Sequence, residues 1–282
     1  VLGVAMERAR ARGGPAAALT FDPHPLEVLR PGHEPVLLTT VEERLERFQA
    51  LGIDAALVLP FDDAFSRISA SAWLDDVLRG RLDAREIVAG SSYTFGFRRE
   101  GTARRLEEWG RAGGVPVHLV PAVLIGGEPV SSSRIRAALR EGLVEDAARL
   151  LGRRYRLAGH VVRGDGRGRT IGVPTANLAA DRRKIVPGRG VYATVATLRG
   201  RRYRGATNIG VRPTFGGGAL NVETLLLDFE GGDCAGEPLA LEFARRVREE
   251  RAFPDPAALV RQIADDVDAV RGSLTAEVMD AP

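Results

Sequence analysis

The chain of 282 residues has one lysine, Lys184, and one cysteine, Cys234. A single cysteine excludes an internal disulfide and suits a reducing compartment, so we expect a cytoplasmic protein. No run approaches the ~20 apolar residues that cross a bilayer, and no signal peptide is visible, so no membrane partner is expected. Nothing in these totals predicts the oligomeric state.

The near absence of lysine limits how the chain can bind phosphate. Nearly all of the 40 basic residues are arginine, and the sequence contains no Gly-Lys-Ser or Gly-Lys-Thr. The usual Walker phosphate loop is therefore excluded. Any phosphate site has to be built from arginine, backbone amides and a metal ion.

The first half of the chain alternates between short apolar runs and amphipathic helical patterns. The runs predict strands at 16–21, 53–61, 84–90 and 115–122. The helical patterns predict helices at 1–14, 39–52, 69–80 and 102–114. Strands alternating with helices indicate an α/β domain with a doubly wound parallel sheet, in which ligands bind at the carboxyl ends of the strands.

The second half has a different pattern. Two short helices are predicted at 131–142 and 144–152, and strands without intervening helices follow at 156–162, 190–198, 202–210, 221–229 and 239–248. A final helix is predicted at 255–272. Many short strands between glycine-rich turns are typical of a small antiparallel barrel or sandwich. We expect two domains, 1–152 and 153–282.

The stretch "GDGRGRTIGVPTANL", residues 164–178, combines glycines with arginines. Glycine lets the backbone turn tightly and approach a ligand, and successive amides in such turns can bind an anion. Arginine would add positive charge. A glycine-rich hairpin without a ligand would give a similar pattern. The candidate phosphate-binding residues are Gly164, Gly166, Arg167, Gly168, Arg169 and Gly172.

The end of this stretch, "PTAN", places Thr175 and Asn177 two residues apart. In an extended segment they would face the same side. A hydroxyl and an amide oxygen are hard ligands that suit Mg²⁺ bridging phosphates. The alternative is a threonine and an asparagine that stabilise a turn.

A carboxylate lies on an apolar strand face in "NVETLLLDF". Glu223 shares that face with Asn221, Leu225 and Leu227 if the segment is a strand. A carboxylate there is costly unless it is paired or takes part in chemistry. Glu223 could take a proton from an attacking hydroxyl, or it could be the partner of one of the many arginines.

Three further segments are candidate sites. "SSSRIR" (131–136) would offer serine hydroxyls, helix amides and arginines to a phosphate, or form an ordinary helix cap. "FDPHP" (21–25) follows a strand, where His24 belongs to a catalytic loop or a rigid turn. "REERAFPDP" (248–256) has the composition of a solvated face.

Together and in this order, the segments resemble the bacterial bifunctional riboflavin kinase/FAD synthetase family. The resemblance covers nearly the whole chain and rests on "TFDPHP", "SSSRIRAALREG", "GRGRTIGVPTAN", "NIGVRPTFGG", "VETLLLDF" and "REERAFP". It implies a nucleotidyltransferase-like N-terminal domain that joins AMP from ATP to FMN. It also implies a C-terminal flavokinase barrel with a terminal helix that phosphorylates riboflavin with ATP.

The resemblance also implies roles for individual residues. Thr175 and Asn177 would bind Mg²⁺ and nucleotide phosphates, and Glu223 would be the general base. The glycine-rich loop would close over the nucleotide. Flavin would contact Arg248 and Phe253, and phosphates in the N-terminal reaction would contact Ser132, Ser133 and Arg136.

The sequence departs from the family pattern in three places. The family's N-terminal loop with its His-x-Gly-His signature is absent, Ser92 stands where an acid or amide is usual, and Leu225 replaces a usual histidine. The first two lead us to expect FMN formation with little FAD formation. The third leaves the kinase base in place.

Two other functions are weighed against this one. A small barrel with basic loops can bind nucleic acid, but aromatic residues are only 6% of the chain and no aromatic-rich strand offers a stacking surface. An adenylyltransferase acting on another small substrate fits the first half alone and ignores the barrel. We therefore expect small-molecule substrates and no nucleic-acid partner.

Overall fold

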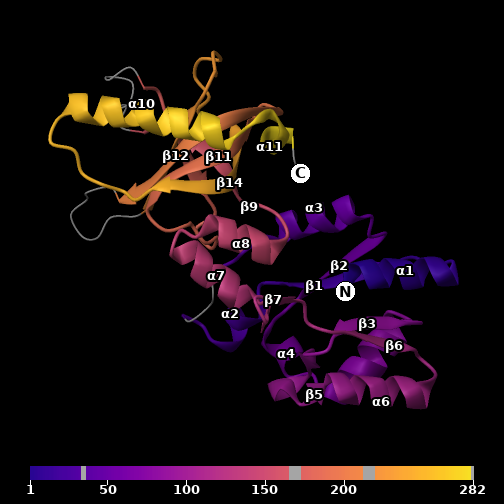
Figure 1. Ribbon diagram of the computed structural model, residues 1–282. Coiled ribbons are helices and arrows are strands. Elements are labelled where there is room, and N and C mark those ends of the chain that lie inside the picture. Colours follow the sequence, from indigo (N-terminus) through magenta and orange to yellow (C-terminus); the bar gives the residue numbers. More distant parts are fainter. Residues whose placement is uncertain (33–35, 165–172, 212–219, 281–282) are drawn as a thin grey trace. The chain divides into compact units, whose positions relative to one another are not determined.

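The computed structural model describes residues 1–32, 36–164, 173–211 and 220–280 (Figure 1). The chain divides into two compact units, Val1–Pro129 and Val130–Pro282. Among the described residues, no helix combines the length and the apolar character needed to cross a bilayer. The expected domain boundary at residue 152 remains a prediction, because the division into units concerns spatial contacts and not activities.

The N-terminal unit has the predicted α/β character. Parallel strands occur in two pairs: β1 (Ala17–Asp22) with β2 (Ala55–Pro60), and β3 (Ile87–Gly90) with β6 (Val117–Val120). Two short antiparallel pairs join β4 (Thr94–Phe95) to β5 (Gly101–Thr102) and β7 (Leu124–Ile125) to β8 (Glu128–Pro129). The helical segments are α1 (Leu2–Arg12), α2 (Pro25–Leu29), α3 (Val41–Leu51), α4 (Asp63–Ser66), α5 (Ala70–Ala72), a π-helical segment (Trp73–Arg81), a 3₁₀ turn (Phe97–Arg99) and α6 (Ala103–Gly113).

Both ends of α3, which falls within the predicted helix 39–52, are fixed by residues close to them in the sequence. The Thr40 hydroxyl accepts a hydrogen bond from the Glu43 backbone N–H at 3.3 Å, and the Glu43 carboxylate accepts one from the Thr40 N–H at 3.1 Å. Gly52 ends the helix with φ of 80°, which glycine adopts without steric cost. A capping box and a left-handed terminal glycine therefore fix both ends of α3.

An ionic cluster around Glu86 connects α1 to the neighbouring strands. The Arg8 Nε lies 2.5 Å from one carboxylate oxygen, Arg12 contacts the other oxygen, and His118 Nε2 lies 2.6 Å from the first. The hydrogen bond from Arg8, assisted by those from Arg12 and His118, holds the pKa of Glu86 at about 2 against the effect of burial. Since α1 has no fully buried side chain, this cluster is an important part of its attachment.

The C-terminal unit contains the predicted antiparallel barrel. Its strands close in the order β10-β13-β12-β11-β14-β9. They are β9 (Tyr155–Val162), β10 (Ala176–Ala180), β11 (Gly190–Leu198), β12 (Arg201–Val211), β13 (Leu220–Leu226) and β14 (Pro238–Arg248). Of these, β10 was not predicted as a strand, because the short stretch "ANLAA" lacks a strong β pattern.

Four helices accompany the barrel among the described residues: α7 (Ser132–Arg140), α8 (Val144–Leu151), α10 (Pro256–Ser273) and α11 (Ala276–Asp280). Helix α10 lies across the outside of the barrel (Figure 1). Its Val270, and Leu274 directly after its end, pack with Ala193 and Val195 of β11. This contact defines the outer face of the strands beneath α10, since side chains alternate between the two faces of a strand.

The opposite face of these strands forms the interior. Tyr192 and Phe243 are fully buried and pack edge to face, with ring centroids 5.4 Å apart. Hydroxyls of three threonines on neighbouring strands form a buried chain, Thr194 to Thr207 at 2.7 Å and Thr207 to Thr224 at 2.9 Å. These hydrogen bonds satisfy polar groups inside the barrel and help to fix the register of β13 against β12.

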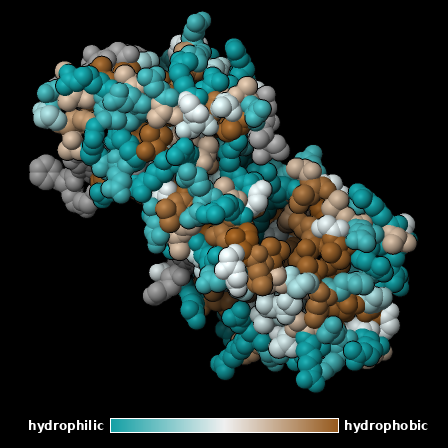
Figure 2. Space-filling view, viewed as in Figure 1, coloured by the Kyte–Doolittle hydropathy of each residue, from teal (hydrophilic) through white to brown (hydrophobic). Residues whose placement is uncertain are grey.

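The two units differ in how completely they bury their strands. No residue of β2 or β6 is fully buried, whereas all but one residue of β11 is. On the face shown in Figure 2, apolar side chains gather on the N-terminal unit, while the barrel unit is mostly hydrophilic. The barrel is therefore the more completely packed of the two units.

Candidate active site

Three polar residues from distant parts of the sequence are aligned across neighbouring barrel strands. Glu223 on β13 is directly opposite Asn177 on β10 and Asn208 on β12. Directly opposed residues of antiparallel strands point to the same side, with Cα atoms about 4.5–5.5 Å apart. We call Asn177, Glu223 and Asn208 the polar row.

Glu223 lies on the outer face of the barrel, on the same side of β13 as Leu225. Leu225, two residues further on, packs into the apolar cluster under α10. Asn221 donates a hydrogen bond from Nδ2 to the Glu223 Oε1 at 2.6 Å. Within the described parts of the chain, which leave out Arg167, Arg169 and Arg212, no arginine or lysine forms an ion pair with Glu223.

The two candidate metal ligands lie at the start of β10. Asn177 is 5% exposed, and Thr175 is half-buried immediately before the strand. With the Glu223 carboxylate opposite, this region offers hydroxyl, amide and carboxylate oxygens, which suit a hard cation. The described residues contain no cluster of three His, Cys, Asp or Glu side chains that could hold a metal, so a magnesium ion here would depend on such oxygens and on phosphate.

Gly164 lies directly against Asn177. A Cβ atom added to Gly164 would be 2.3 Å from the Asn177 Nδ2 and 2.8 Å from its Cγ. The backbone at residue 164 therefore approaches the amide more closely than any side chain would allow. The other candidates of this loop, Gly166, Arg167, Gly168, Arg169 and Gly172, lie outside the described residues.

Replacing Gly164 with alanine tests this close approach. The new methyl group would turn the Asn177 amide away, because the end of a side chain moves more easily than the backbone. We expect KM for MgATP to rise about tenfold, the size of effect seen when the support of a metal ligand is lost. Gly272→Ala is the control, because no atom lies within 4 Å of its added Cβ. Equal KM values for the two variants would contradict the role given to Gly164.

The single lysine is buried in the barrel unit. Lys184 is 4% exposed, and its Nζ donates a hydrogen bond to the Arg156 carbonyl at 2.9 Å. The same nitrogen lies 5.0 Å from the centre of the Tyr155 ring. These contacts place Lys184 in the packing of the barrel.

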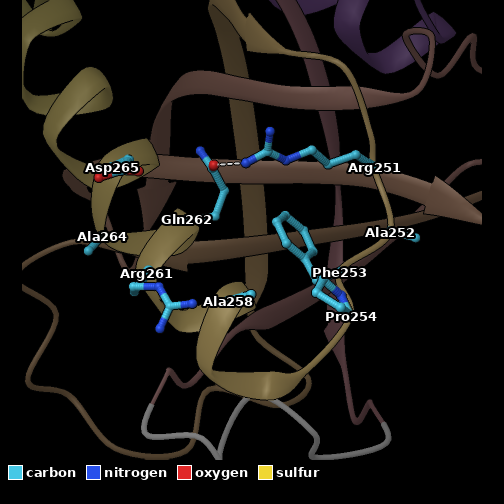
Figure 3. Close-up of a pocket in the computed structure, with 9 residues that line it drawn as sticks. All are labelled: Arg251, Ala252, Phe253, Pro254, Ala258, Arg261, Gln262, Ala264 and Asp265. Atoms are coloured by element: carbon cyan, nitrogen blue, oxygen red, sulfur yellow. Dashed lines mark hydrogen bonds between the residues drawn. The ribbon is translucent and has the colours of Figure 1, made fainter.

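The segment after β14 forms one wall of a cavity of about 660 Å³, and α10 forms the other (Figure 3). Figure 3 shows Phe253 pointing into this cavity, with Arg251 and Gln262 joined by a hydrogen bond above it. A cavity of this size falls in the range of small-molecule sites, roughly 300–1,000 Å³. Most residues of this segment are exposed, as its composition predicts, and the half-buried Phe253 is among those that line the cavity.

The two predicted flavin residues are close together but differ in their surroundings. Phe253 lines the cavity. Arg248 is absent from its lining, and its guanidinium forms an ion pair with Asp266 at 2.8 Å while lying 5.6 Å from the Phe253 ring centre. Arg248 is also aligned with the polar row, because it is opposite Val191, which is itself opposite Asn208.

The same segment, residues 249–255, approaches the polar row through Glu250. A Cβ atom on Gly210 would be 2.2 Å from a carboxylate oxygen of Glu250 and 3.4 Å from the Asn208 Nδ2. The Glu250 carboxylate therefore lies over β12, next to Asn208. The cavity wall and the polar row are parts of one region of the barrel surface.

The serine-rich segment forms the start of helix α7. The cap is Ser131, whose hydroxyl accepts a hydrogen bond from the Arg134 N–H at 3.3 Å, while Ser132 and Ser133 are exposed in the first turn. Burial, and then the nearby positive charge of Arg140, hold the pKa of Arg136 below its usual value. An anion beside Arg136 would relieve both effects, which fits the predicted phosphate contact.

His24 has a local structural role. Its Nδ1 accepts a hydrogen bond from the Leu26 N–H at 3.1 Å, and its own N–H donates to the Glu27 carboxylate at 3.0 Å. This capping box starts α2 immediately after the turn. Of the two interpretations of "FDPHP", the rigid turn is the one that the contacts support.

Sequence reasoning assigned no role to four residues near the site: Asn208 and Asn221 on the barrel strands, and Gln262 and Asp266 on α10. Asn221 had a usable signal, since it shares a strand face with Glu223. The others depend on which strand or helix lies beside them, and no local pattern distinguishes them from ordinary polar residues of a strand or helix.

The chain was compared with known proteins. Residues 151–274 match the riboflavin kinase family model and residues 1–134 match the FAD synthetase family model. The bifunctional riboflavin kinase/FMN adenylyltransferase of Bacillus subtilis (strain 168) is 36% identical over 272 residues, covering 94% of this chain and 84% of the relative. The Escherichia coli (strain K12) protein of the same name is 34% identical over 261 residues, covering 92% and 83%.

A crystal structure of a Streptococcus pneumoniae protein named a macrolide-efflux protein has the same fold, with a TM-score of 0.87 and 32% identity. The alignment covers 96% of this chain and 88% of that one. The two family matches and the extent of identity confirm the resemblance drawn from the motifs. The chain belongs to the family of bifunctional riboflavin kinases/FMN adenylyltransferases.

Proposed function

We propose that the barrel phosphorylates riboflavin to FMN at the polar row and the adjoining cavity, and that the N-terminal part serves the joining of AMP to FMN. The observation that carries the kinase assignment is Glu223, a carboxylate on an apolar strand face with Asn177 directly opposite. Homologues named for both activities support the assignment over most of the chain.

In the proposed kinase reaction, Glu223 accepts the proton of the riboflavin 5′-hydroxyl. The hydroxyl oxygen then forms a bond to the γ-phosphorus of ATP, the bond to the bridging oxygen breaks, and ADP leaves. Asn221 holds the Glu223 carboxylate in place through its 2.6 Å hydrogen bond. Positioning of this kind supplies much of the catalysis in phosphoryl transfer.

Thr175 and Asn177 would hold Mg²⁺ together with the nucleotide phosphates. Magnesium, when bound, neutralises the negative charge that develops on the phosphates during transfer. Gly164 gives the backbone its close approach to the Asn177 amide, and Gly166, Arg167, Gly168, Arg169 and Gly172 would continue the phosphate-binding loop.

The cavity between Glu249–Asp255 and α10 would take the flavin ring. An isoalloxazine ring is planar and aromatic, and the Phe253 ring in the cavity wall offers a surface for stacking. Its position on the same region of the surface as the polar row would bring the ribityl hydroxyl toward Glu223. Arg248 would contribute to flavin binding indirectly, because its guanidinium lies against the Phe253 ring.

For the second activity, Ser132, Ser133 and Arg136 of α7 would contact phosphates. The exposed hydroxyls and the two cationic side chains near each other, Arg136 and Arg140, support anion binding there. The substrates and products are small molecules: riboflavin, ATP and FMN. A cytoplasmic location agrees with the single cysteine, and no nucleic-acid or membrane partner is proposed.

Incubation of the purified chain with riboflavin, ATP and Mg²⁺, followed by chromatography, tests the proposed function. We expect an FMN peak that disappears when the metal is removed with a chelator. Absence of FMN from a folded preparation would refute the kinase assignment. FAD elutes separately, so the same chromatogram also tests for the second activity.

A further inference from the structure

The carboxylate of Asp266 is buried in α10 and holds two side chains. Asp266 is 4% exposed. Arg248 donates to it from Nε and Nη2, each at 2.8 Å, and Gln262 donates from Nε2 at 2.8 Å. A paired, two-point contact between a guanidinium and a carboxylate fixes the guanidinium in both position and orientation.

The contacts continue from Asp266 to the cavity. The Gln262 Oε1 accepts a hydrogen bond from the Arg251 Nη2, as the dashed line in Figure 3 shows. The guanidinium carbons of Arg248 and Arg251 lie 5.6 Å and 5.1 Å from the centre of the Phe253 ring. One buried carboxylate therefore orients two cations that both contact the aromatic wall of the cavity.

Attachment of α10 does not explain this arrangement. The helix is held to the barrel by Val270 and Leu274, which are fully buried, and by an exposed ion pair between Arg271 and Asp228 at 2.8 Å. A buried ion pair adds little net stability, because removing both charges from water costs about as much as their attraction returns. The Asp266 pair is therefore better explained by what it positions.

We propose that Asp266 is the positioning residue of the flavin cavity, acting through Arg248 and through Gln262 and Arg251 to hold Phe253 ready for the flavin ring. The inference rests on the proposed assignment of the cavity to riboflavin. A wall that is ordered before binding lowers the entropy cost of binding. Asp266 should then affect riboflavin and leave the nucleotide side of the reaction unchanged.

The test compares Asp266→Asn with Asp228→Asn, which removes the exposed ion pair of the same helix. In Asp266→Asn we expect KM for riboflavin to rise about tenfold, with KM for MgATP and kcat changed less than about twofold. Asp228→Asn should match wild type in all three constants. An unchanged KM for riboflavin, or equal rises in both KM values, would overturn the proposal.

A second variant keeps the test decisive if Asp266→Asn folds poorly. Gln262→Leu breaks the connection to Arg251 at a half-buried position and should raise KM for riboflavin by about fivefold without lowering the thermal unfolding midpoint. The double variant, Asp266→Asn with Gln262→Leu, should raise KM for riboflavin by less than the product of the two single increases, because both substitutions act through one network. If the two increases in KM multiplied in the double variant, the residues would act independently and the network would be contradicted.

These outcomes are separable from failure of the proposed function. If wild-type protein makes no FMN, the kinase assignment fails, and the positioning role fails with it. If wild type makes FMN and the Asp266→Asn and Gln262→Leu variants keep the wild-type KM for riboflavin, the kinase assignment stands and only the positioning role is wrong.

Discussion

Glu223→Gln is expected to lower kcat for FMN formation by ~10²- to 10⁴-fold, the usual contribution of a general base. Glutamine keeps the shape of the side chain and can still contact Asn221, but it cannot accept the proton of the riboflavin hydroxyl. The loss should appear in kcat while KM for MgATP stays near the wild-type value. The measurement is the steady-state rate of FMN formation at saturating riboflavin and ATP.

The matched control for this prediction is Glu242→Gln. Glu242 is also a half-buried glutamate on a barrel strand, but it has arginine partners: Arg202 at 3.3 Å and Arg154 at 3.8 Å. Its substitution should change the thermal unfolding midpoint more than the rate. If Glu223→Gln behaved in the same way, with stability altered and kcat kept, then Glu223 would be a structural residue and the proposed base would have to be sought elsewhere.

Asn177→Leu is expected to reduce FMN formation by at least about 100-fold, comparable to removing one group that stabilises transition-state charge. Leucine has a similar size but offers no oxygen to a metal ion. The loss should persist when the Mg²⁺ concentration is raised, because the ligand itself is missing. The rate is measured as a function of Mg²⁺ at fixed ATP.

Asn177→Asp distinguishes metal binding from packing. Aspartate keeps an oxygen at the same place, so it should retain more activity than leucine and respond to Mg²⁺ at a different concentration. Unfolding midpoints of both variants are needed, since residue 177 is buried. Equal activity of the leucine variant and the wild type would remove Asn177 from the site.

The elements that were predicted from the sequence are those with local signals. A helix was predicted at 39–52, and in the structure Thr40 and Glu43 form a capping box at its start while Gly52 ends it in the left-handed conformation. Glu223 was singled out because strand periodicity put it on one face with Leu225, and that face is indeed the one under α10. Signals within a short stretch sufficed in both cases: end residues for α3 and strand periodicity for β13.

The polar row could not be predicted as a row. Asn208 and Glu223 lie opposite each other only because of the register between β12 and β13, and a shift of one residue would put them on opposite faces. The buried hydrogen bonds of Thr207 and Thr224 contribute to that register, and they too depend on the folded barrel. Pairings between separate segments are not encoded in any short stretch.

The contacts of Arg248 beside the cavity could not be predicted from the sequence either. Sequence analysis could connect Arg248 and Phe253 to flavin only through the family resemblance. It could not show that Asp266, on the later helix α10, holds the Arg248 guanidinium in a two-point contact. That contact arises from the packing of α10 on the barrel, which brings two helix residues to the end of β14.

The transfer of a labelled γ-phosphate from ATP to riboflavin tests the central claim most directly. The full chain is incubated with riboflavin, Mg²⁺ and ATP labelled at the γ-phosphate, and the label in FMN is counted over time for wild type and for Glu223→Gln. The account predicts labelled FMN from wild type and a rate lower by ~10²-fold or more from the variant. FMN that carries no label, or equal rates of labelling in the two proteins, would contradict it.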